Sequence, residues 1–548
     1  MLRYKSRRQL GKEAKIASLK SLDGAVFRKA RVSRKTAIAL ESCIQGDVVW
    51  PWDPAYETDR KQFDPAYSEY PEVIVYCKTL DDISCCLQTA NVQGWTVTCR
   101  SGGHNTAGYS VLTGTMTIDM SCYFNQVHVD ASKQFAVVGA GTTFETLDAK
   151  LEEYDLHVPG GECPDVCVGG YVQGGGYGFT SRQYGMHCDN VVEARVILMD
   201  SNGVPHLVVA NESKNKELFW ALRGGTGNNF GVLIDLKYKV HPVGMLWGFT
   251  IQWDNPDEMV QALLMVQNKY AKGAPDELGF QGALMLLPSV KDKQKKLPSY
   301  LLSGIYNGPE SKGRALIEPL LQIGTSRSRK LTTYTGMFSE LNKKIMPDPN
   351  LPTNYKGFPP EVKESRYIAQ PIDETGWRKI VDYFNQRPAW NVTNAVFLEY
   401  YGGAINRVPI NATAFIHRDV YMDIYVDSFW YDVNNETQKS DAGNWLDGYM
   451  SLLENYSNGQ RYQNYPRRNM MNYQWAFWEQ AIYTLAPLRT KCDPLGILDF
   501  PMSATLPSDP NDPVYQKVKR ADRKSRFPKA KIVYDQAYEK HRKRFTGK

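Results

Sequence analysis

Short apolar runs alternate with segments of helical spacing through the first half of the chain. "EVIVYCKT" is an apolar run bounded by charged residues, and "LDDISCCLQTANVQG" after it has apolar residues at helical spacing and ends at Gly94. Strands are predicted for "WTVTCRSGG", "GTMTIDMS", "QFAVVGAGTTF" and "GVLIDLKYKVHP", and a helix opened by a capping threonine for "TFETLDAKLEEYD". This pattern predicts a mixed helix and sheet domain that ends near Met245.

Long strand-like runs dominate the second half. "NAVFLEYYGGA" and "DVYMDIYVDSFW" are separated by helical and proline-rich segments, which indicates a second α+β domain with a mainly antiparallel sheet. A compact aromatic segment follows it. We therefore expect an α+β protein with two domains and three smaller parts: an N-terminal arm at 1–44, a first domain at 45–245, a second at 246–456, a C-terminal segment at 457–510 and a tail at 511–548.

Length and composition agree with two folded domains. A chain of 548 residues exceeds a single ordinary core, and 42% hydrophobic with 12% aromatic residues argues against disorder. No apolar run reaches the roughly 18 residues needed to span a bilayer, so no membrane partner is expected.

The net charge of +6 hides an uneven distribution. The first 35 residues contain 12 basic and 2 acidic side chains, residues 512–548 contain 13 and 4, and the remainder contains 40 and 53. An acidic body with basic ends forms no nucleic-acid-binding stripe, so we expect solvated basic ends and no nucleic-acid partner.

The compartment stays open at this stage. The basic start lacks the apolar core of a secretory signal, which favours the cytoplasm, yet five glycosylation sequons leave secretion possible. Ten cysteines include no C-x-x-C pair, so neither a metal site nor a dense disulfide framework is predicted. Cys43 is a candidate partner for either Cys85 or Cys86.

Three glycine clusters within about 130 residues point to a phosphate-bearing cofactor. They are "RSGGH", the run "GGYVQGGGYG" and "LRGGTGNNFG". Backbone N–H groups approach a pyrophosphate most closely where no Cβ intervenes. "VVGAGTTF" lacks the third glycine of the Rossmann fingerprint, and no glycine run is followed by a Walker lysine. Tight turns between strands would explain one cluster more easily than all three.

The order of four motifs carries a resemblance. "RSGGH", "CPDVCVGGYVQGGGYG", "YGMHCDNV" and "LFWALRGGTGNNFGV" occur in the order seen in the berberine-bridge-enzyme-like family of flavoprotein oxidases, within the vanillyl-alcohol-oxidase fold group. The similarity covers about 45–245 and 395–505. It implies a PCMH-type FAD-binding domain, a substrate domain built on a large antiparallel sheet covered by helices, and a C-terminal segment that returns to the FAD domain.

The resemblance also implies a doubly attached FAD. His104 matches the family histidine bonded to the 8α-methyl of the flavin, and Cys163 matches the cysteine bonded to C6. A turn histidine and a buried thiol are the alternative reading of the same residues. Further FAD contacts are expected from Arg100, Ser101, Gly102, Gly103, Asn105, Gly108, Tyr109, Ser110, Val168, Gly169, Gly170, Gly174, Gly175, Gly176, Gly178, Tyr184, Gly185, Asp189, Asn190, Val191, Gly231, Val232 and Asn464.

The family motif Y-x-N-Y-P supplies the expected base. "GQRYQNYPRR" resembles it and assigns Tyr462 as the group that takes the substrate hydroxyl proton, with Asn464 in contact with the flavin. Arg461, Arg467 and Arg468 surround Tyr462 in the sequence, and nearby cations favour a phenolate.

Other catalytic candidates come from a strand and two family positions. In "VYMDIYVDSFW" the period of two places Asp423 and Tyr425 on one face, and the family strand supplies a residue beside the base. A solvated strand face is the alternative. Tyr184 matches a tyrosine that lines the family active site. Val166 stands where members that react with oxygen carry valine and dehydrogenases carry Ile or Leu.

Three functions follow from these residues. The first is a carbohydrate oxidase that converts an anomeric carbon to a lactone and O2 to H2O2. The alternative is a biosynthetic oxidase of an alkaloid, polyketide or aromatic alcohol, and the third is a flavin-binding protein without activity. A small-molecule substrate and O2 are the expected partners, and a monomer or small homo-oligomer the expected state.

Overall fold

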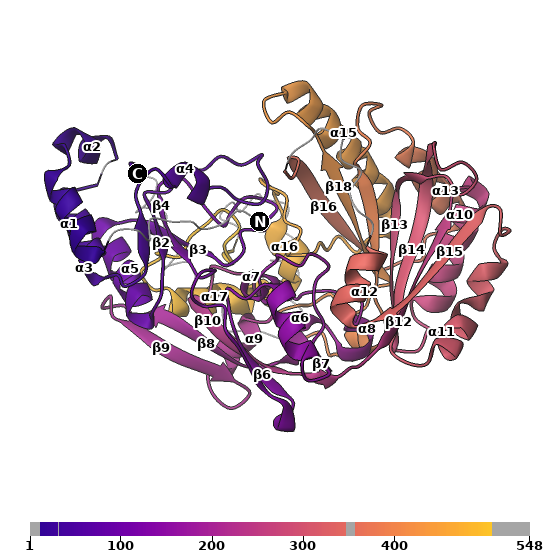
Figure 1. The fold of residues 1–548 in the computed structure, drawn as a ribbon, viewed down its shortest axis with the longest axis horizontal. Helices are drawn as coiled ribbons and strands as arrows, with labels where there is room; N and C mark the ends of the chain where they lie inside the picture. Colours follow the sequence, from indigo (N-terminus) through magenta and orange to yellow (C-terminus); the bar gives the residue numbers. More distant parts are fainter. Residues whose placement is uncertain (1–10, 31, 347–356, 507–548) are drawn as a thin grey trace.

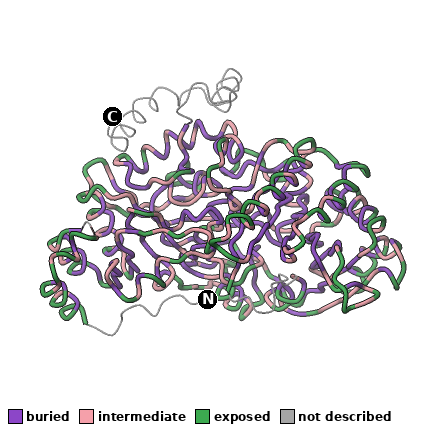
Figure 2. Tube along the Cα trace, turned by 90° about the horizontal axis from the view of Figure 1, so that it is seen from above, coloured by how far each residue is buried: buried purple, intermediate pink, exposed green. Residues whose placement is uncertain are grey.

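The computed structural model describes residues 11–30, 32–346 and 357–506, and the predicted tail at 511–548 lies outside them. The molecule has the predicted α+β architecture, with two parts side by side in Figure 1. Buried segments run through the interior of both parts and through the region where they meet (Figure 2).

The first part contains two sheets. The mixed four-stranded sheet has the order β1-β2-β4-β3, with strands Asp47–Val49, Val73–Tyr76, Thr115–Asp119 and Thr96–Arg100. The antiparallel five-stranded sheet has the order β5-β6-β10-β8-β9, with strands Val127–Asp130, Phe135–Gly139, Val232–Lys239, Val191–Met199 and Pro205–Asn211. The helices of the first part include α5 (Leu80–Gln93), α6 (Phe144–Glu152), α7 (Val168–Gln173) and α9 (Lys216–Ala221). The first glycine loop follows β3, the second begins within α7, and the third connects α9 to β10.

The second part is one antiparallel seven-stranded sheet with most of its helices on one face, while α12 (Phe338–Ile345) packs against β12 and β15 on the other face. Its order is β15-β12-β14-β13-β17-β18-β16, with strands Arg329–Gly336, Leu246–Trp253, Lys296–Tyr306, Leu278–Pro288, Ala395–Tyr400, Met422–Phe429 and Glu361–Ile368. The helices α10 (Pro256–Met265), α13 (Glu374–Phe384) and α15 (Glu436–Leu453) pack on this sheet. Side chains alternate along a strand, so the same strands present a second face away from these helices.

That alternation decides which residues reach the second face. On β18, Ile424 and Val426 pack into the core shared with the helices, whereas Tyr425 between them lies on the other side. On β17, Val396 and Leu398 join the same core. The sequence period of two therefore predicted the two faces of β18 correctly.

The C-terminal segment lies against the first part, where Figure 1 shows α16 (Tyr473–Trp478) and α17 (Ile482–Cys492) beside α7. Val97 N–H donates to the Ile497 carbonyl at 2.7 Å, and Ala504 N–H donates to the Asn229 side chain at 2.8 Å. Backbone hydrogen bonds of this kind hold the segment that carries Tyr462 to the glycine loops.

The N-terminal region differs from the predicted solvated arm. Its described residues form α1 (Lys12–Ser21), α2 (Gly24–Lys29) and α3 (Arg34–Cys43). Leu19, Phe27 and Leu40 are buried in a core shared with the four-stranded sheet. Apolar residues spaced along these basic helices supply enough buried surface to dock them, which net charge alone does not reveal.

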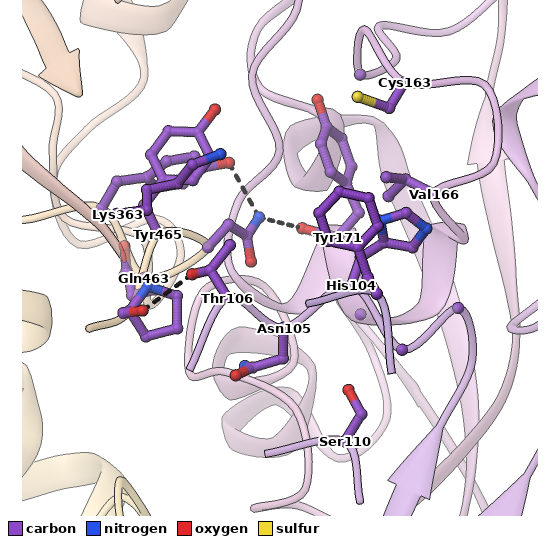
Figure 3. Close-up of a pocket in the computed structure, with 18 of the residues that line it drawn as sticks. His104, Asn105, Thr106, Ser110, Cys163, Val166, Tyr171, Lys363, Gln463 and Tyr465 are labelled. Carbon is purple, nitrogen blue, oxygen red and sulfur yellow. Dashed lines mark hydrogen bonds between the residues drawn. The ribbon is translucent and has the colours of Figure 1, made fainter. Parts of the chain in front are cut away.

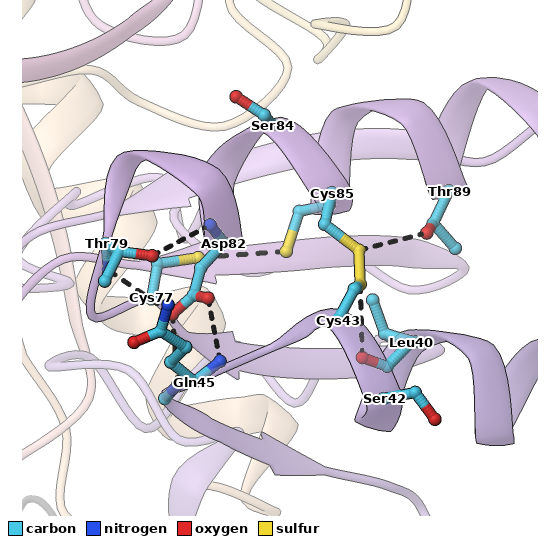
Figure 4. The surroundings of a disulfide bond; sticks show 12 residues. Leu40, Ser42, Cys43, Gln45, Cys77, Thr79, Asp82, Ser84, Cys85 and Thr89 are labelled. Atoms are coloured by element: carbon cyan, nitrogen blue, oxygen red, sulfur yellow. Dashed lines mark hydrogen bonds between the residues drawn. A yellow bond between two sulfur atoms is a disulfide. The ribbon is translucent and has the colours of Figure 1, made fainter.

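A disulfide ties α3 to α5 (Figure 4). Cys43 pairs with Cys85, with Cα atoms 6.5 Å apart, and the neighbouring Cys86 faces Cys77 with sulfur atoms 3.7 Å apart. The geometry thus selects Cys85 from the two partners that the sequence left open.

Replacing Cys43 with serine is expected to lower the free energy of unfolding by about 2–4 kcal/mol, because the disulfide closes a long loop and restricts the unfolded chain. The cysteines are 42 positions apart in the sequence. Urea unfolding under non-reducing conditions measures the change, and Cys122→Ser, outside the disulfide, is the control. Equal stability of Cys43→Ser and wild type would contradict the prediction.

None of the helices in the described part of the chain combines the length and the apolarity that a bilayer crossing requires.

Candidate active site

A cavity of about 550 Å³ opens between the two parts of the molecule. Its volume lies within the range of about 300–1,000 Å³ typical of small-molecule and cofactor sites. The cavity walls are formed by all three glycine loops, by the C-terminal segment, and by the face of the seven-stranded sheet that points away from α10, α13 and α15. Figure 3 shows His104, Cys163 and Val166 on one side, with Lys363 and Tyr465 across from them.

The first glycine loop starts where β3 ends. Arg100, the last residue of that strand, is fully buried and forms an ion pair with Asp119. The guanidinium therefore anchors the loop from behind. Arg100 does not line the cavity, contrary to its assignment as a direct FAD contact.

The two predicted attachment residues share the cavity. His104 Nε2 lies 3.4 Å from a carboxylate oxygen of Asp165, and its ring packs 4.4 Å from the ring of Phe63. Cys163 is exposed to the cavity at the start of the second glycine loop. The fold therefore brings two side chains that are 59 positions apart in the sequence to the same cavity.

The protein around Cys163 disfavours its charged form. Although the side chain is exposed to the cavity, the surrounding cavity walls desolvate the thiol, and this desolvation, followed by the nearby carboxyl of Glu162, raises the pKa of Cys163 to about 12. Lys363 acts in the opposite direction, with a smaller effect. At neutral pH the side chain is a thiol, so any attachment through sulfur needs a proton acceptor.

The predicted FAD residues divide into two groups. Those that line the cavity are Ser101, Gly102, Gly103, His104, Asn105, Tyr109, Ser110, Cys163, Gly170, Gly231 and Asn464. Those that do not line it are Arg100, Gly108, Val168, Gly169, Gly174, Gly175, Gly176, Gly178, Tyr184, Gly185, Asp189, Asn190, Val191 and Val232. For the second group the sequence pattern identified residues that shape the loops instead of residues that face the cavity.

Close backbone packing explains glycines of the second loop. A Cβ on Gly178 would lie 1.8 Å from the carbonyl oxygen of Gly160, and a Cβ on Gly174 would lie 2.1 Å from Oδ1 of Asn464. These contacts leave no room for a side chain. The loop consequently packs directly on the segment that carries the predicted base.

Two N–H groups converge on Tyr462. Asn464 Nδ2 donates to the Tyr462 hydroxyl oxygen at 3.0 Å and to the Tyr171 carbonyl at 2.9 Å. The backbone N–H of Gly176 donates to the same hydroxyl oxygen at 2.9 Å. Hydrogen bonds donated to an oxygen stabilise its negative charge, so this arrangement can hold a phenolate formed during a reaction.

The resting state of Tyr462 is nevertheless the neutral phenol. Burial raises its pKa well above the usual value, and the carboxyl of Glu399 adds to the rise, while the Asn464 and Gly176 donors lower it. The balance of these effects keeps the proton on the phenol until substrate and cofactor change its surroundings.

The neighbouring arginines do not lower this pKa, so the sequence-based expectation about them is wrong. Arg461 and Arg467 form ion pairs with Glu364 at 2.6 and 2.9 Å. Arg468 pairs with Glu69 at 2.7 Å. Adjacent residues in an irregular segment point in different directions, and the three guanidinium groups pair with the carboxylates of Glu364 and Glu69.

Of the two catalytic candidates on β18, one lines the cavity and the other does not. Tyr425 lines the cavity and stacks on Phe397, with ring centroids 4.8 Å apart. Asp423 is fully buried and does not line it. Asp427, further along the same face, does line the cavity.

Three other predicted residues support the structure from outside the cavity. Tyr184 stacks on His241 with centroids 4.1 Å apart and accepts a hydrogen bond from Asn307 at 3.0 Å. The carboxylate of Asp189 pairs with Arg418 at 2.6 Å. Asn190 bonds to the His241 ring at 2.7 Å. The assignment of Tyr184 to the active-site lining is therefore corrected.

The sequence analysis missed several polar cavity residues, and four of them matter most for the chemistry. Glu162, Lys363, Glu399 and Tyr465 all line the cavity. Lys363 Nζ lies 3.0 Å from the carboxylate of Asp427. It also lies 5.2 Å from the centroid of the Tyr425 ring and 5.0 Å from that of the Tyr465 ring. The signal for Glu399 was present as a carboxylate inside the apolar run "NAVFLEYY".

The third glycine loop contributes strained backbone. Thr226 and Asn228 line the cavity with φ angles of 65° and 63°, in the left-handed region that non-glycine residues rarely adopt. The Asn228 side chain accepts a hydrogen bond from Cys99 N–H at 3.1 Å, which braces this loop against β3. Such conformations concentrate at ligand sites, where the surroundings hold them in place.

The lining residues fit an FAD molecule. A Cβ on Gly170 would meet no atom within 4 Å, which leaves space beside α7 for a ligand to approach the backbone. Gln173 Oε1 is buried at the cavity without a hydrogen-bond partner among the described residues. His104, Cys163 and the three glycine loops would hold the cofactor. No cluster of metal-ligating side chains occurs among the residues that the structure describes.

Comparisons with known proteins agree with this site. A family model described as an FAD-binding domain matches residues 71–204. The uncharacterised FAD-linked oxidoreductase YgaK of Bacillus subtilis is 26% identical over 466 residues, which cover 84% of this chain and 97% of that protein. The berberine-bridge-enzyme-like protein 1 of Physcomitrella patens superposes with a TM-score of 0.75 at 25% identity, over 86% of this chain and all of the other.

A chitooligosaccharide oxidase has the same fold, with a TM-score of 0.73 at 22% identity, over 85% of this chain and 99% of the other. The domain match, the full-length relative and the superposition agree with the motifs and with the cavity. The chain is an FAD-linked oxidoreductase, and it is similar to proteins of the berberine-bridge-enzyme-like family.

Proposed function

We propose that the protein is an oxidase with FAD attached to both His104 and Cys163, and that it oxidises an alcohol or hemiacetal carbon of a carbohydrate to a lactone while O2 becomes H2O2. The observation that carries this proposal is the convergence of two N–H donors on Tyr462, in the cavity that His104 and Cys163 share. Such a group takes a proton from an alcohol and holds the resulting charge.

The protein's own residues manage the proton. In its phenolate form, whose share increases with pH, Tyr462 accepts it from the substrate hydroxyl, and the amide of Asn464 with the N–H of Gly176 keeps the phenol oxygen in place. FAD held by His104, Cys163 and the glycine loops would supply the acceptor for the hydride from the same carbon and the two electrons that reduce O2. Burial around Tyr462 excludes water, which strengthens these hydrogen bonds.

The polar part of the cavity favours a polyhydroxylated substrate. Glu399, Asp427 and Tyr465 lie on the wall formed by the sheet and the C-terminal segment, and each can hydrogen-bond to hydroxyl groups. The rings of Tyr425 and Phe397 beside them offer faces on which a sugar can stack. The structural neighbour named for chitooligosaccharide oxidation supports this substrate class.

A second candidate is an oxidase of an aromatic or other apolar alcohol. It is favoured by the apolar stretch of the cavity wall, which is formed by Met285, Met346, Phe358, Phe397 and Phe429. Side chains of this kind bury an apolar ring more readily than a sugar.

A substrate panel with two readouts tests the function. Mono- and oligosaccharides are compared with aryl alcohols, first by anaerobic bleaching of the flavin and then by H2O2 release. Bleaching by sugars with production of a lactone supports the proposal, and bleaching by aryl alcohols alone transfers it to the second candidate. A flavin that no compound in either class bleaches would overturn both.

Val166 is expected to control access of O2. It lines the cavity three positions after Cys163, where a larger side chain would fill space beside the flavin. Val166→Leu should slow reoxidation of the reduced flavin by at least tenfold and leave reduction by substrate nearly unchanged. Stopped-flow measurement of both half-reactions tests this, and equal slowing of the two would contradict it.

A further inference from the structure

Two carboxyl side chains face each other across β17 and β18. Glu399 and Asp423 are direct register partners in this antiparallel pair, so their side chains lie on the same face of the sheet. Both are buried, with 2% and 0% of their surface exposed. Glu399 lines the cavity, whereas Asp423 does not.

Three of the four carboxyl oxygens have no hydrogen-bond partner among the described residues. These are both oxygens of Asp423 and Oε2 of Glu399. The fourth, Oε1 of Glu399, accepts a hydrogen bond from the Tyr465 hydroxyl at 2.6 Å. The hydroxyl of Ser365 approaches Asp423 without the geometry of a hydrogen bond.

The nearest cations already have other partners. Arg366 pairs with Glu364 at 2.6 Å and with Glu454 at 2.8 Å. Lys363 lies 3.0 Å from Asp427. Two adjacent ionised carboxylates without a cation or donors would be strongly unfavourable in this buried position.

A shared proton resolves the conflict. Burial raises the pKa of Asp423 to about 8, and burial followed by the Asp423 charge raises the pKa of Glu399 well above its usual value. The two groups titrate as a pair, so the pair retains at least one proton at neutral pH. Because the Tyr465 hydroxyl occupies Oε1 of Glu399, Oε2 is the oxygen of Glu399 that can carry the proton.

We propose that Asp423 keeps Glu399 protonated and that Glu399 donates its O–H to a substrate oxygen beside the carbon being oxidised. Asp423 is then a positioning residue that acts through Glu399. This inference rests on the proposed function, because it assumes that an oxygen-bearing substrate occupies the cavity. It adds a specific hydrogen-bond donor to a wall that also presents Asp427, Lys363 and Tyr465.

The direction of the pH effect follows from the raised pKa. The donor is present below the apparent pKa of the pair and is lost above it, so KM should rise as pH increases through the neutral to alkaline range. The charged or titratable groups that face the pair from the surrounding elements are Glu162, Tyr171, Tyr177, Lys363, Arg366, Tyr367, Tyr401, Tyr425, Tyr462 and Tyr465.

Three variants separate the roles of the two carboxyls. Asp423→Asn removes the charge that keeps Glu399 protonated, so the rise in KM should begin at least one pH unit lower. Glu399→Gln keeps an N–H donor at every pH, so the rise should disappear. Asp148→Asn is the matched control, because Asp148 is a buried carboxyl on α6 with an unpartnered oxygen and lies outside the cavity lining. An Asp423→Asn profile equal to that of wild type would overturn the proposal.

A second measurement needs no substrate. Infrared difference spectra of the flavin-loaded protein at neutral pH, wild type minus Asp423→Asn and wild type minus Glu399→Gln, should show the loss of a protonated-carboxyl band in both cases. If neither variant loses that band, the pair holds no proton at neutral pH and the proposal is refuted. This conclusion holds even if one variant has no enzymatic activity. If no compound in the panel bleaches the flavin, the proposed function fails, but the infrared spectra still show whether the pair of Glu399 and Asp423 is protonated.

Discussion

Replacing Tyr462 with phenylalanine is expected to slow flavin reduction by about 10²–10⁴, which is the usual contribution of a positioned base. The substitution removes one oxygen and leaves the ring, which packs at 4.8 Å from Tyr465 and 6.1 Å from Phe415. Packing and flavin attachment should therefore survive. Anaerobic stopped-flow reduction, with a substrate found in the panel, measures the effect.

The pH profile provides a second, independent signature of Tyr462. Its pKa is raised, mainly by burial, so the reactive phenolate form becomes more available as pH increases. Reduction of the wild-type protein should accelerate from neutral to alkaline pH, and the phenylalanine variant should lose this dependence. The arginines beside Tyr462 in the sequence favour a lower pKa, but their ion pairs with Glu364 and Glu69 reverse that expectation.

Tyr473→Phe is the matched control for this experiment. Tyr473 belongs to the same C-terminal segment, is buried, and donates its hydroxyl to the Ser503 carbonyl at 2.9 Å, but it does not line the cavity. It should reduce flavin at the wild-type rate. A Tyr462→Phe protein reduced within a few-fold of wild type, with the same pH profile, would assign the base to another residue, and Tyr425 would be tested next.

Doubly attached flavin should remain with the denatured protein. Acid precipitation of wild type is expected to leave the pellet yellow, and digestion should yield one flavin linked to the peptides that contain His104 and Cys163. Each single replacement by alanine should retain one link, and the double replacement should release all flavin as free FAD. Mass spectrometry of the flavin peptides measures each case.

A neighbouring thiol provides the control for attachment. Cys167 lies four positions after Cys163 and also lines the cavity, but its thiol is directed at the Gly141 carbonyl at 3.3 Å. Cys167→Ser should keep both links. Free FAD in the supernatant of the denatured wild-type protein would contradict double attachment.

The rate of attachment through sulfur should depend on pH. Desolvation by the cavity walls raises the pKa of the Cys163 thiol to about 12, so the thiolate becomes more available as pH increases. In a His104→Ala protein the flavin can attach only through Cys163. The rate of that attachment should therefore increase strongly as the pH is raised into the alkaline range.

Local patterns in the sequence predicted much of the architecture. The alternation on "VYMDIYVDSFW" placed Asp423 and Tyr425 on one face of a strand, and the structure has them there. The glycine clusters marked the loops around the cavity. These features depend on the backbone geometry of a few consecutive residues, so neighbouring letters carry the information.

Other features depend on contacts between distant segments. Tyr425 reaches the cavity while Asp423, two residues earlier on the same face, is covered, because the cavity extends along only part of the sheet. Tyr184 stacks on His241 outside the cavity. The N-terminal helices pack on the first part despite their positive charge. No periodicity within a segment encodes what will cover it.

The sequence by itself determined the α+β class, the order of the glycine loops and the side chains able to carry flavin chemistry. Only the tertiary structure decided which of them share a cavity, which cysteine Cys43 joins, and that Glu399 and Asp423 are paired without a cation. The physical reason is that burial and electrostatic partners set the pKa of each group, and both arise when strands and loops far apart in the chain come together.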